Sequence, residues 1–212
     1  MYAPTPFFSD DINITADLVE TIVMGTLVTS GSDTASAPSL QGSPLPFMIE
    51  KNDDGTAKLI SHMDRRNPLW REMEDGREVL VIFWGPSAYI SPSIYTTTPR
   101  VPTWIYTTAH VSGMPRLVHD GDAKDKIVSD LCRFMEKPDS GWDISQVGDY
   151  KARLLDAIVG FEIDITSAQS QVRLGQLNNS EDLKAVYEAL SHGAPGDMQV
   201  AEIMKNMGIV EL

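Results

Sequence analysis

The segment LISHMDRRNPLW (residues 59–70) gathers the groups in this sequence that are best suited to bind an anion. Its polar members are Ser61, His62, Arg65, Arg66 and Asn67. The pattern predicts a strand followed by a helix that starts near Asp64, so two guanidinium groups would lie beside free backbone N–H groups, which suits a phosphate. The alternative is that both arginines only offset neighbouring carboxylates, such as Asp64, Glu72 and Glu74, on a solvated surface.

A second signal lies in VPTWIYTTAHVSG (residues 101–113), which alternates as a strand does. One face carries Trp104, Tyr106, Thr108, His110 and Ser112, and the other carries Thr103, Ile105, Thr107, Ala109 and Val111. The two aromatic rings can form a flat apolar wall, and the polar side chains beyond them can contact the edge of a bound ring. Alternatively this face is a dimer interface, where Trp and Tyr are also enriched. In a barrel that dimerises along its side, both interpretations hold together.

Common catalytic and metal-binding motifs are absent from the sequence. It contains no GxGxxG, GxxxxGK[ST], HExxH, GxSxG or CxxC pattern, and its four histidines stand at no metal-ligand spacing. We therefore predict no metal site and assign no catalytic residue. If the protein is an enzyme, His110 is the first side chain to test as a general acid or base.

The composition limits the partners that the chain can take. A net charge of -13 repels nucleic acid, so we do not expect direct DNA binding. No stretch approaches the about 20 apolar residues that span a bilayer, and the first residues are acidic where a secretory signal is basic. The lone Cys132 cannot form an intramolecular disulfide and fits a reducing cytoplasm. These features predict a cytoplasmic protein that does not contact membranes.

Short β segments dominate the first two thirds of the sequence. Strands are predicted at 23–29, 44–49, 56–62, 79–84, 88–93, 101–113 and 158–166, with a partner strand at 170–177. A turn at residues 52–55 joins two of them as a hairpin, and residues 31–43 form a polar loop. Helices are predicted at 9–23, from 64, at 122–137, 149–157, 180–191 and 197–208. The pattern favours a mainly β fold, a closed antiparallel barrel or sandwich, with peripheral helices.

Several segments together resemble one known family. MYAPTPFFSDD, SHMDRRNPLW, VIFWGPSAYISPSIY, RVPTWIYTTAHVSG and AIVGFEIDIT occur in the order and spacing of the PaiB-like proteins, often called FMN-binding negative transcriptional regulators. These belong to the flavin-binding split-barrel superfamily that includes pyridoxamine phosphate oxidase. The resemblance covers residues 1–177, which predicts an FMN-binding split β-barrel domain there and a C-terminal helical extension at 178–212.

The resemblance implies a homodimer that holds FMN at the subunit interface. The residues that it places around the FMN phosphate are Leu45, Pro46, Ser61, His62, Arg65, Arg66 and Asn67. Trp104 and Tyr106 would surround the isoalloxazine ring, with His110 at its edge. Arg173 occupies the place of a basic residue near the end of the family pattern.

The sequence departs from that family pattern at three places near the expected flavin. Asp64 puts an anion beside Arg65, Ile105 stands where many members have Asn, and RLGQLNN, with Leu177, replaces KLSQNR. Each change removes a polar contact or adds repulsion, so we expect lower FMN affinity or another phosphate-bearing ligand.

Three functions follow from these observations. The first is an FMN-binding negative regulator or flavin-linked sensor whose effect on transcription is indirect. The second is an FMN-dependent oxidoreductase of the flavin reductase or pyridoxamine phosphate oxidase type. The third is a flavin-free interaction module in which the basic turn is an ordinary solvated surface.

Overall fold

The structure is a computed structural model that describes residues 1–31, 40–137 and 139–211. The chain forms two compact units. The barrel unit comprises Asp10–Phe83 and Ala109–Gln169, and the terminal unit comprises Met1–Ser9, Trp84–Thr108 and Ser170–Leu212. Three long strands, β6 (Val79–Ile90), β7 (Thr103–Val118) and β8 (Ile158–Arg173), each contribute residues to both units.

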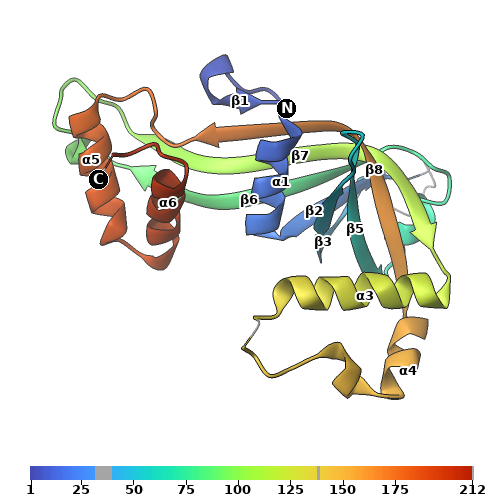
Figure 1. Cartoon of the computed structure of the whole chain (residues 1–212). Coiled ribbons are helices and arrows are strands. Elements are labelled where there is room, and N and C mark those ends of the chain that lie inside the picture. The colour runs from blue at the N-terminus through green and yellow to red at the C-terminus, as the bar shows by residue number, and fades with distance from the viewer. Residues whose placement is uncertain (32–39, 138, 212) are drawn as a thin grey trace. The chain divides into compact units, whose positions relative to one another are not determined.

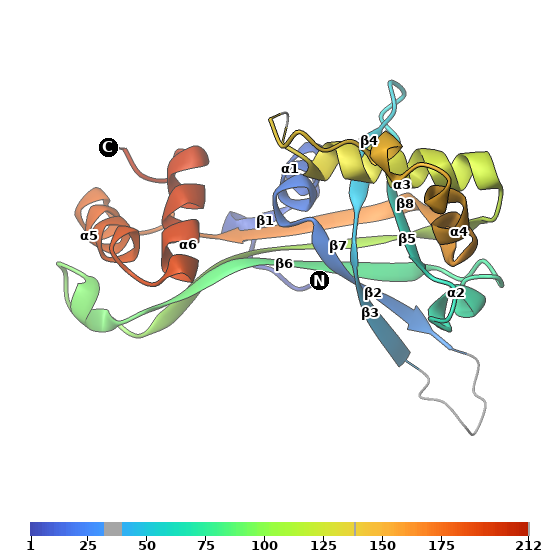
Figure 2. The ribbon, with the colours of Figure 1, turned by 90° about the horizontal axis from the view of Figure 1, so that it is seen from below.

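The barrel unit is built on a sheet with the strand order β3-β2-β6-β7-β8-β5-β4. Its shorter strands are β2 (Met24–Ser30), β3 (Leu40–Pro46), β4 (Met48–Lys51) and β5 (Ala57–Asp64). The pairs β2–β3, β2–β6, β4–β5 and β5–β8 are antiparallel, and Figure 2 shows β2 and β3 side by side. The strands at the two ends of this order, β3 and β4, are consecutive in the chain with Phe47 between them. The chain therefore links the two edges of the sheet.

Three aromatic rings that are distant in sequence meet in the core of the barrel unit. Phe47 packs edge-on against Phe83, with ring centroids 5.6 Å apart, and against Phe161 at 6.1 Å. All three side chains are fully buried. Offset and edge-to-face ring pairs stabilise beyond their buried area, so the residue that links β3 to β4 also fixes the barrel core.

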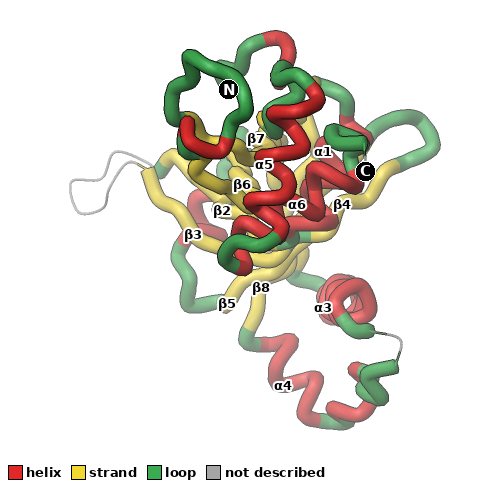
Figure 3. The backbone as a smooth tube through the Cα atoms, turned by 90° about the vertical axis from the view of Figure 1, so that its left-hand side faces the viewer, coloured by secondary structure: helices red, strands yellow, loops and turns green. Residues whose placement is uncertain are grey.

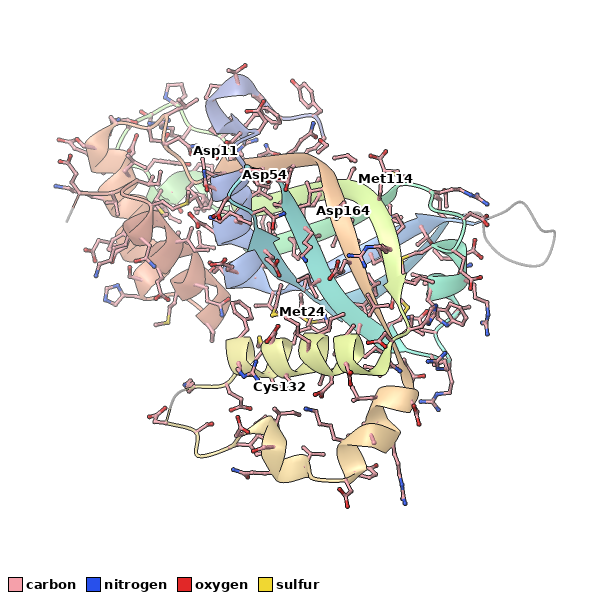
Figure 4. All side chains as sticks on the ribbon, turned by 45° about the vertical axis from the view of Figure 1, so that its right-hand side comes forward. Asp11, Met24, Asp54, Met114, Cys132 and Asp164 are labelled. Atoms are coloured by element: carbon pink, nitrogen blue, oxygen red, sulfur yellow. The ribbon has the colours of Figure 1, made fainter. Side chains whose placement is uncertain are left out.

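One glycine of β7 is required by the close approach of β8. A Cβ atom at Gly113 would overlap the backbone carbonyl of Asp164, so no larger residue fits without a shift of one strand. Figure 4 labels Asp164 and the neighbouring Met114 on these two strands.

Within the described ranges, the barrel unit contains four α-helices. They are α1 (Ile12–Ile22), α2 (Leu69–Glu72), α3 (Gly121–Met135) and α4 (Tyr150–Asp156). Asp11 caps α1 by accepting a hydrogen bond from the backbone N–H of Asn13 at 2.8 Å (Figure 4). The apolar side of α3 packs on β5 through Ile127, Leu131 and Ile60. The two helices α3 and α4 are both seen outside the sheet in Figure 3, and Lys124 of α3 donates to the Leu155 carbonyl of α4.

The terminal unit has a separate apolar core. Strand β1 (Phe8–Ser9) pairs with the end of β8, and the helices α5 (Ser180–Ser191) and α6 (Pro195–Asn206) lie side by side (Figure 1). Their buried faces share one cluster: Ala88, Ile90, Ile105, Leu174, Val186, Leu190, Val200, Ala201, Met204 and Val210. The C-terminal helices thus pack with parts of β6 and β7. The predicted boundary at residue 177 stays a prediction.

The antiparallel sheet with helices was predicted, but some element boundaries were wrong. Residues 79–84 and 88–93 were predicted as two strands, and β6 runs through Val79–Ile90 without a break. The predicted pair at 158–166 and 170–177 is likewise the single strand β8, which ends at Arg173. Residues 40–43 of the predicted polar loop belong to β3, and 32–39 lie outside the described residues. In the described ranges, no helix has the length and apolar character needed to cross a membrane.

Candidate functional site

The basic turn, which we define as residues 61–67, differs in backbone from the sequence prediction. β5 continues to Asp64, and the helix α2 begins only at Leu69 and has four residues. The predicted helix start at Asp64 is therefore wrong, because the backbone N–H groups of Arg66 and Asn67 are held by Asp64 instead, through its carboxylate at 2.8 Å and its carbonyl at 2.9 Å. An Asx-type turn of this kind competes with helix formation at its own position.

Arg65 uses most of its guanidinium within the protein. Its Nε donates to the Asp156 carbonyl at 2.9 Å and its Nη2 donates to the Ile158 carbonyl at 3.0 Å. Its backbone N–H donates to the Ala157 carbonyl at 2.8 Å. These carbonyls lie at or just after the C-terminal end of α4, where a cation is favourable. Arg65 therefore joins β5 to the start of β8 and keeps only Nη1 without an acceptor among the described residues.

Arg66 forms an ion pair with Asp64. Its Nη2 lies 2.6 Å from Oδ2 of Asp64, and its Nε donates to Oδ1 at 3.0 Å. Hydrogen bonds from Arg66 lower the pKa of Asp64 to about 2, so the carboxylate is charged at neutral pH. The Arg66 side chain is 91% exposed. This geometry matches the alternative in which an arginine of the turn offsets a neighbouring carboxylate.

The remaining polar residues of the turn are tied to β3. The Ser61 hydroxyl donates to the Pro46 carbonyl at 2.6 Å, and the Asn67 amide donates to the Ser43 hydroxyl at 2.9 Å. Leu45, which lies between these two positions of β3, is buried. The structure thus brings Leu45, Pro46, Ser61 and Asn67 together, and their role in binding a phosphate stays a prediction.

His62 carries a polar atom that fits a ligand at this turn. Its Nδ1 is buried and has no hydrogen-bond partner within the part of the chain that the structure describes. Burial lowers the pKa of His62, so its imidazole is neutral at pH 7. An unsatisfied buried nitrogen is uncommon in native proteins, and a bound molecule would supply its partner.

The aromatic face of the terminal unit consists of Trp84, Tyr89, Trp104 and Tyr106. Trp84 stacks on Tyr106 with ring centroids 5.5 Å apart and planes 12° apart, and Tyr89 meets Trp104 edge-on at 5.8 Å. Trp84, Tyr89 and Trp104 are 60%, 51% and 55% exposed. Trp84 and Tyr89 were not among the site residues predicted from the sequence. Side chains alternate between the two faces of a regular strand, so residues five apart should face opposite sides. Trp84 and Tyr89 are both exposed because the alternation of buried and exposed residues along β6 is interrupted between them, as in a β-bulge.

Arg173 lies away from this aromatic face. Its Nη2 donates to the hydroxyl of Thr103 at 3.1 Å. Thr103 and the buried Ile105 alternate along β7 with Trp104 and Tyr106, so they project to the opposite side of the strand. Within one chain, the structure does not bring Arg173 together with Trp104 and Tyr106.

His110 belongs to the barrel unit. It is half-buried on β7, and burial lowers its pKa, so the neutral imidazole dominates at pH 7. No group of three or more His, Cys, Asp or Glu side chains within the described ranges could hold a metal ion.

Comparison with known proteins decides the family. The chain matches the family described as "Putative FMN-binding domain" over residues 1–167. It is 32% identical over 216 residues to "Protease synthase and sporulation protein PAI 2" of Bacillus subtilis, with 97% of both chains covered. The chain is a PaiB-like FMN-binding family member. FMN is therefore the cofactor of this PaiB-like chain, and the resemblance drawn from its sequence motifs is confirmed.

Solved structures confirm the fold of this PaiB-like protein. The flavocytochrome Anf3 from Azotobacter vinelandii superposes with a TM-score of 0.59 at 11% identity, covering 86% of this chain and 78% of that one. A FAD and heme binding protein from Mycobacterium smegmatis gives a TM-score of 0.56 at 16% identity, covering 84% and 78%. At these identities the likeness concerns the fold, which is the predicted flavin-binding split barrel.

Proposed function

We propose that this protein is a homodimeric, FMN-binding negative regulator or flavin-linked sensor that acts in the cytoplasm. The observation that carries the proposal is the aromatic face, because a set of four stacked and edge-on rings, three of them exposed, suits both a planar cofactor and a partner subunit. The lone cysteine supports the cytoplasmic assignment.

The isoalloxazine ring is assigned to the aromatic face, with Trp104 and Tyr106 as its principal contacts. Both residues lie in a stacked or edge-on ring pair with a residue of β6, which holds their orientation before a ligand arrives. His110 is assigned to the edge of the bound ring on the sequence pattern. When bound, FMN supplies electron and hydride transfer, while the protein supplies binding and orientation.

The FMN phosphate is assigned to the basic turn. The supporting observations are the buried Nδ1 of His62, which lacks a partner among the described residues, and the exposed guanidinium of Arg66. The hydrogen bonds of Ser61 and Asn67 hold β3 against the turn, so Leu45 and Pro46 lie next to the proposed phosphate position. In this state Arg66 exchanges part of its pairing with Asp64 for the phosphate, which carries two negative charges and binds guanidinium forks strongly.

An indirect effect on transcription accords with the charge of the chain. A net charge of -13 opposes the contacts with DNA phosphates that supply most nonspecific affinity. We infer that a change in flavin state is passed on through a protein partner. A mobility-shift assay at low salt tests this step, and tight, sequence-selective DNA binding would overturn the indirect assignment.

Titration of FMN with the purified protein tests the central proposal. Quenching of flavin fluorescence and a shifted absorbance spectrum are expected, with sedimentation at the mass of two chains. Trp104→Ala should weaken FMN binding by about tenfold or more. Exposed Trp142 lies in the barrel unit, and Trp142→Ala is the matched control that should leave binding unchanged. Unaltered FMN binding by the Trp104 variant would refute the assignment of the ring.

An FMN-dependent oxidoreductase is the second candidate, and the neutral, half-buried His110 favours it. A neutral imidazole can accept a proton near pH 7, as a general base must. NAD(P)H oxidation stimulated by added FMN and lost in His110→Gln would establish this function over the regulatory one. Absence of that activity in protein that binds FMN would rule it out for these reductants.

A further inference from the structure

The terminal unit contains a cavity that the proposed flavin contacts do not use. It has a volume of about 390 Å³ and is open to solvent. We call it the Arg173 cavity, and its lining includes Phe7, Tyr95, Arg100, Thr103, Arg173 and Leu177. Thr103 places it on the side of β7 opposite Trp104. A cavity of this volume accommodates a small organic molecule.

One of the two cavity arginines is neutralised by a buried carboxylate. Asp182 of α5 is fully buried and forms an ion pair with Arg100. The same carboxylate accepts from the backbone N–H of Thr96 at 2.7 Å and from the hydroxyl of Thr97 at 2.6 Å. Arg100 also donates to Asn178 at 3.1 Å. The Arg100 side chain therefore links α5 to the loop that precedes β7 and is not available to a ligand. Figure 1 shows this loop near α5.

Arg173 has a different environment in the same cavity. No carboxylate within the described ranges pairs with it, and it contacts the Thr103 hydroxyl at 3.1 Å and the Phe7 ring at 5.4 Å from the centroid. A guanidinium has five N–H donors, so most of its hydrogen-bonding capacity is unused. A partly buried cation with unused donors favours an anion within reach.

The other residues that line the cavity indicate what kind of uncharged group this anion carries. Phe7, Tyr95, Ile105 and Leu177 present apolar or aromatic surface around the Arg173 guanidinium. Because Arg100 is offset by Asp182, the cavity offers a single net positive charge. A carboxylate matches that charge and can accept two parallel hydrogen bonds from a guanidinium. Leu177, a departure from the family sequence pattern, adds apolar surface where a polar residue would have favoured a more polar ligand.

We propose that the Arg173 cavity binds a small organic carboxylate with a flat apolar or aromatic body, held by Arg173 and packed between Phe7, Tyr95 and Leu177. The C-terminal helices then have a role in this site, because Asp182 of α5 fixes the wall that Arg100 and Tyr95 form. Within one chain, the site is separate from the proposed FMN contacts on β7, and Arg173, which the family resemblance counts among the FMN-binding residues, is here assigned to the carboxylate.

Para-fluorobenzoate observed by fluorine NMR tests the proposal with a defined probe. Saturable binding to the full chain is expected, with neutral para-fluorobenzamide bound about tenfold more weakly or not at all. Arg173→Gln should weaken para-fluorobenzoate binding by about tenfold or more, and Arg173→Lys should restore part of it. Arg133→Gln, which removes an exposed arginine of the barrel unit, is the matched control.

Further variants and a competition keep the outcome decisive. Leu177→Asn tests the apolar wall at an exposed position and should weaken the probe about threefold without unfolding. FMN binding is measured in parallel, and an excess of FMN should leave the bound probe in place. No saturable binding, equal binding by Arg173→Gln, or displacement of the probe by FMN would each overturn the proposal, whether or not FMN itself binds.

Discussion

The basic turn and the Arg173 cavity each present two arginines, but they differ in how many of the charges are available. In the turn, Arg65 donates to backbone carbonyls at the end of α4 and Arg66 pairs with Asp64. In the cavity, Arg100 pairs with buried Asp182, whereas Arg173 has no carboxylate partner in the described chain. Two adjacent arginines in the sequence thus give less free positive charge than one arginine whose neighbours are apolar.

This difference shows what decides whether an arginine binds a ligand. The donors of a guanidinium are directional, and those that already have internal acceptors contribute little to an incoming anion. The turn must release a pair before it can clamp a phosphate with Arg66. In the cavity, no ion pair of Arg173 with the described residues has to break before an anion binds. Differences in affinity between anions should therefore depend on how well the uncharged part of each ligand fits the apolar lining.

The largest expected effect comes from removing the charge that neutralises Arg100. Asp182→Asn leaves a partly buried guanidinium unpaired and turns amide hydrogens toward the donors of Thr96 and Thr97. We expect the melting temperature to fall by about 5–10 °C. Asp75→Asn removes the carboxylate of an exposed pair and should change it little. Equal melting temperatures for both variants would contradict the structural role of Asp182.

The same carboxylate makes the terminal unit sensitive to acid. Desolvation raises the pKa of Asp182, but hydrogen bonds from Thr97 and Thr96 outweigh it and place the pKa below the ordinary value of 3.8. A depressed pKa stabilises the folded state fully above the unfolded value, and the contribution is lost as pH falls below it. The difference in melting temperature between wild type and Asp182→Asn should therefore be constant from pH 7 to about pH 5 and shrink below about pH 4. A constant difference down to pH 3 would be evidence against this linkage.

The sequence predicted the architecture better than the strand lengths. β6 and β8 each contain a polar or Gly-Pro segment that is typical of a turn, and both continue through it. Local composition cannot show that neighbouring strands supply hydrogen bonds across such a segment. The hairpin turn at residues 52–55 was predicted correctly because its cause is local: the Asn52 N–H donates to the Thr56 carbonyl at 2.8 Å.

The candidate sites show the same limit at the level of side chains. The residues of the basic turn are neighbours in sequence, so their proximity could be predicted, but the carbonyls that occupy Arg65 come from 91 and 93 residues away. The Arg173 cavity combines residues 7, 95–105 and 173–178, and no local pattern predicts that they meet. Buried Asp182 resembles an ordinary helix-start acid until the structure places Arg100 beside it.

A smaller effect separates the two arginines of the turn. Arg65→Ala removes two charge-assisted hydrogen bonds to carbonyls and should lower the free energy of unfolding by about 1 kcal/mol. Arg66→Ala leaves the fold unchanged, since that side chain is 91% exposed, and should instead weaken FMN binding. Urea unfolding and FMN titration of both variants measure the two effects. If Arg66→Ala were the more destabilising change, the description of the turn would be wrong.

The smallest expected effect tests whether Asp64 competes with the FMN phosphate for Arg66. With a pKa of about 2, Asp64 is charged throughout the usual range of pH and holds two nitrogens of the guanidinium. Asp64→Asn releases these nitrogens for the phosphate, so FMN should bind about threefold more tightly with the melting temperature nearly unchanged. The gain should vanish in the background of Arg66→Ala, because Asp64 then has no guanidinium to hold. A gain in FMN affinity that persists in this background would mean that Asp64 repels the phosphate directly through its charge. Competition for Arg66 would then be ruled out as the cause.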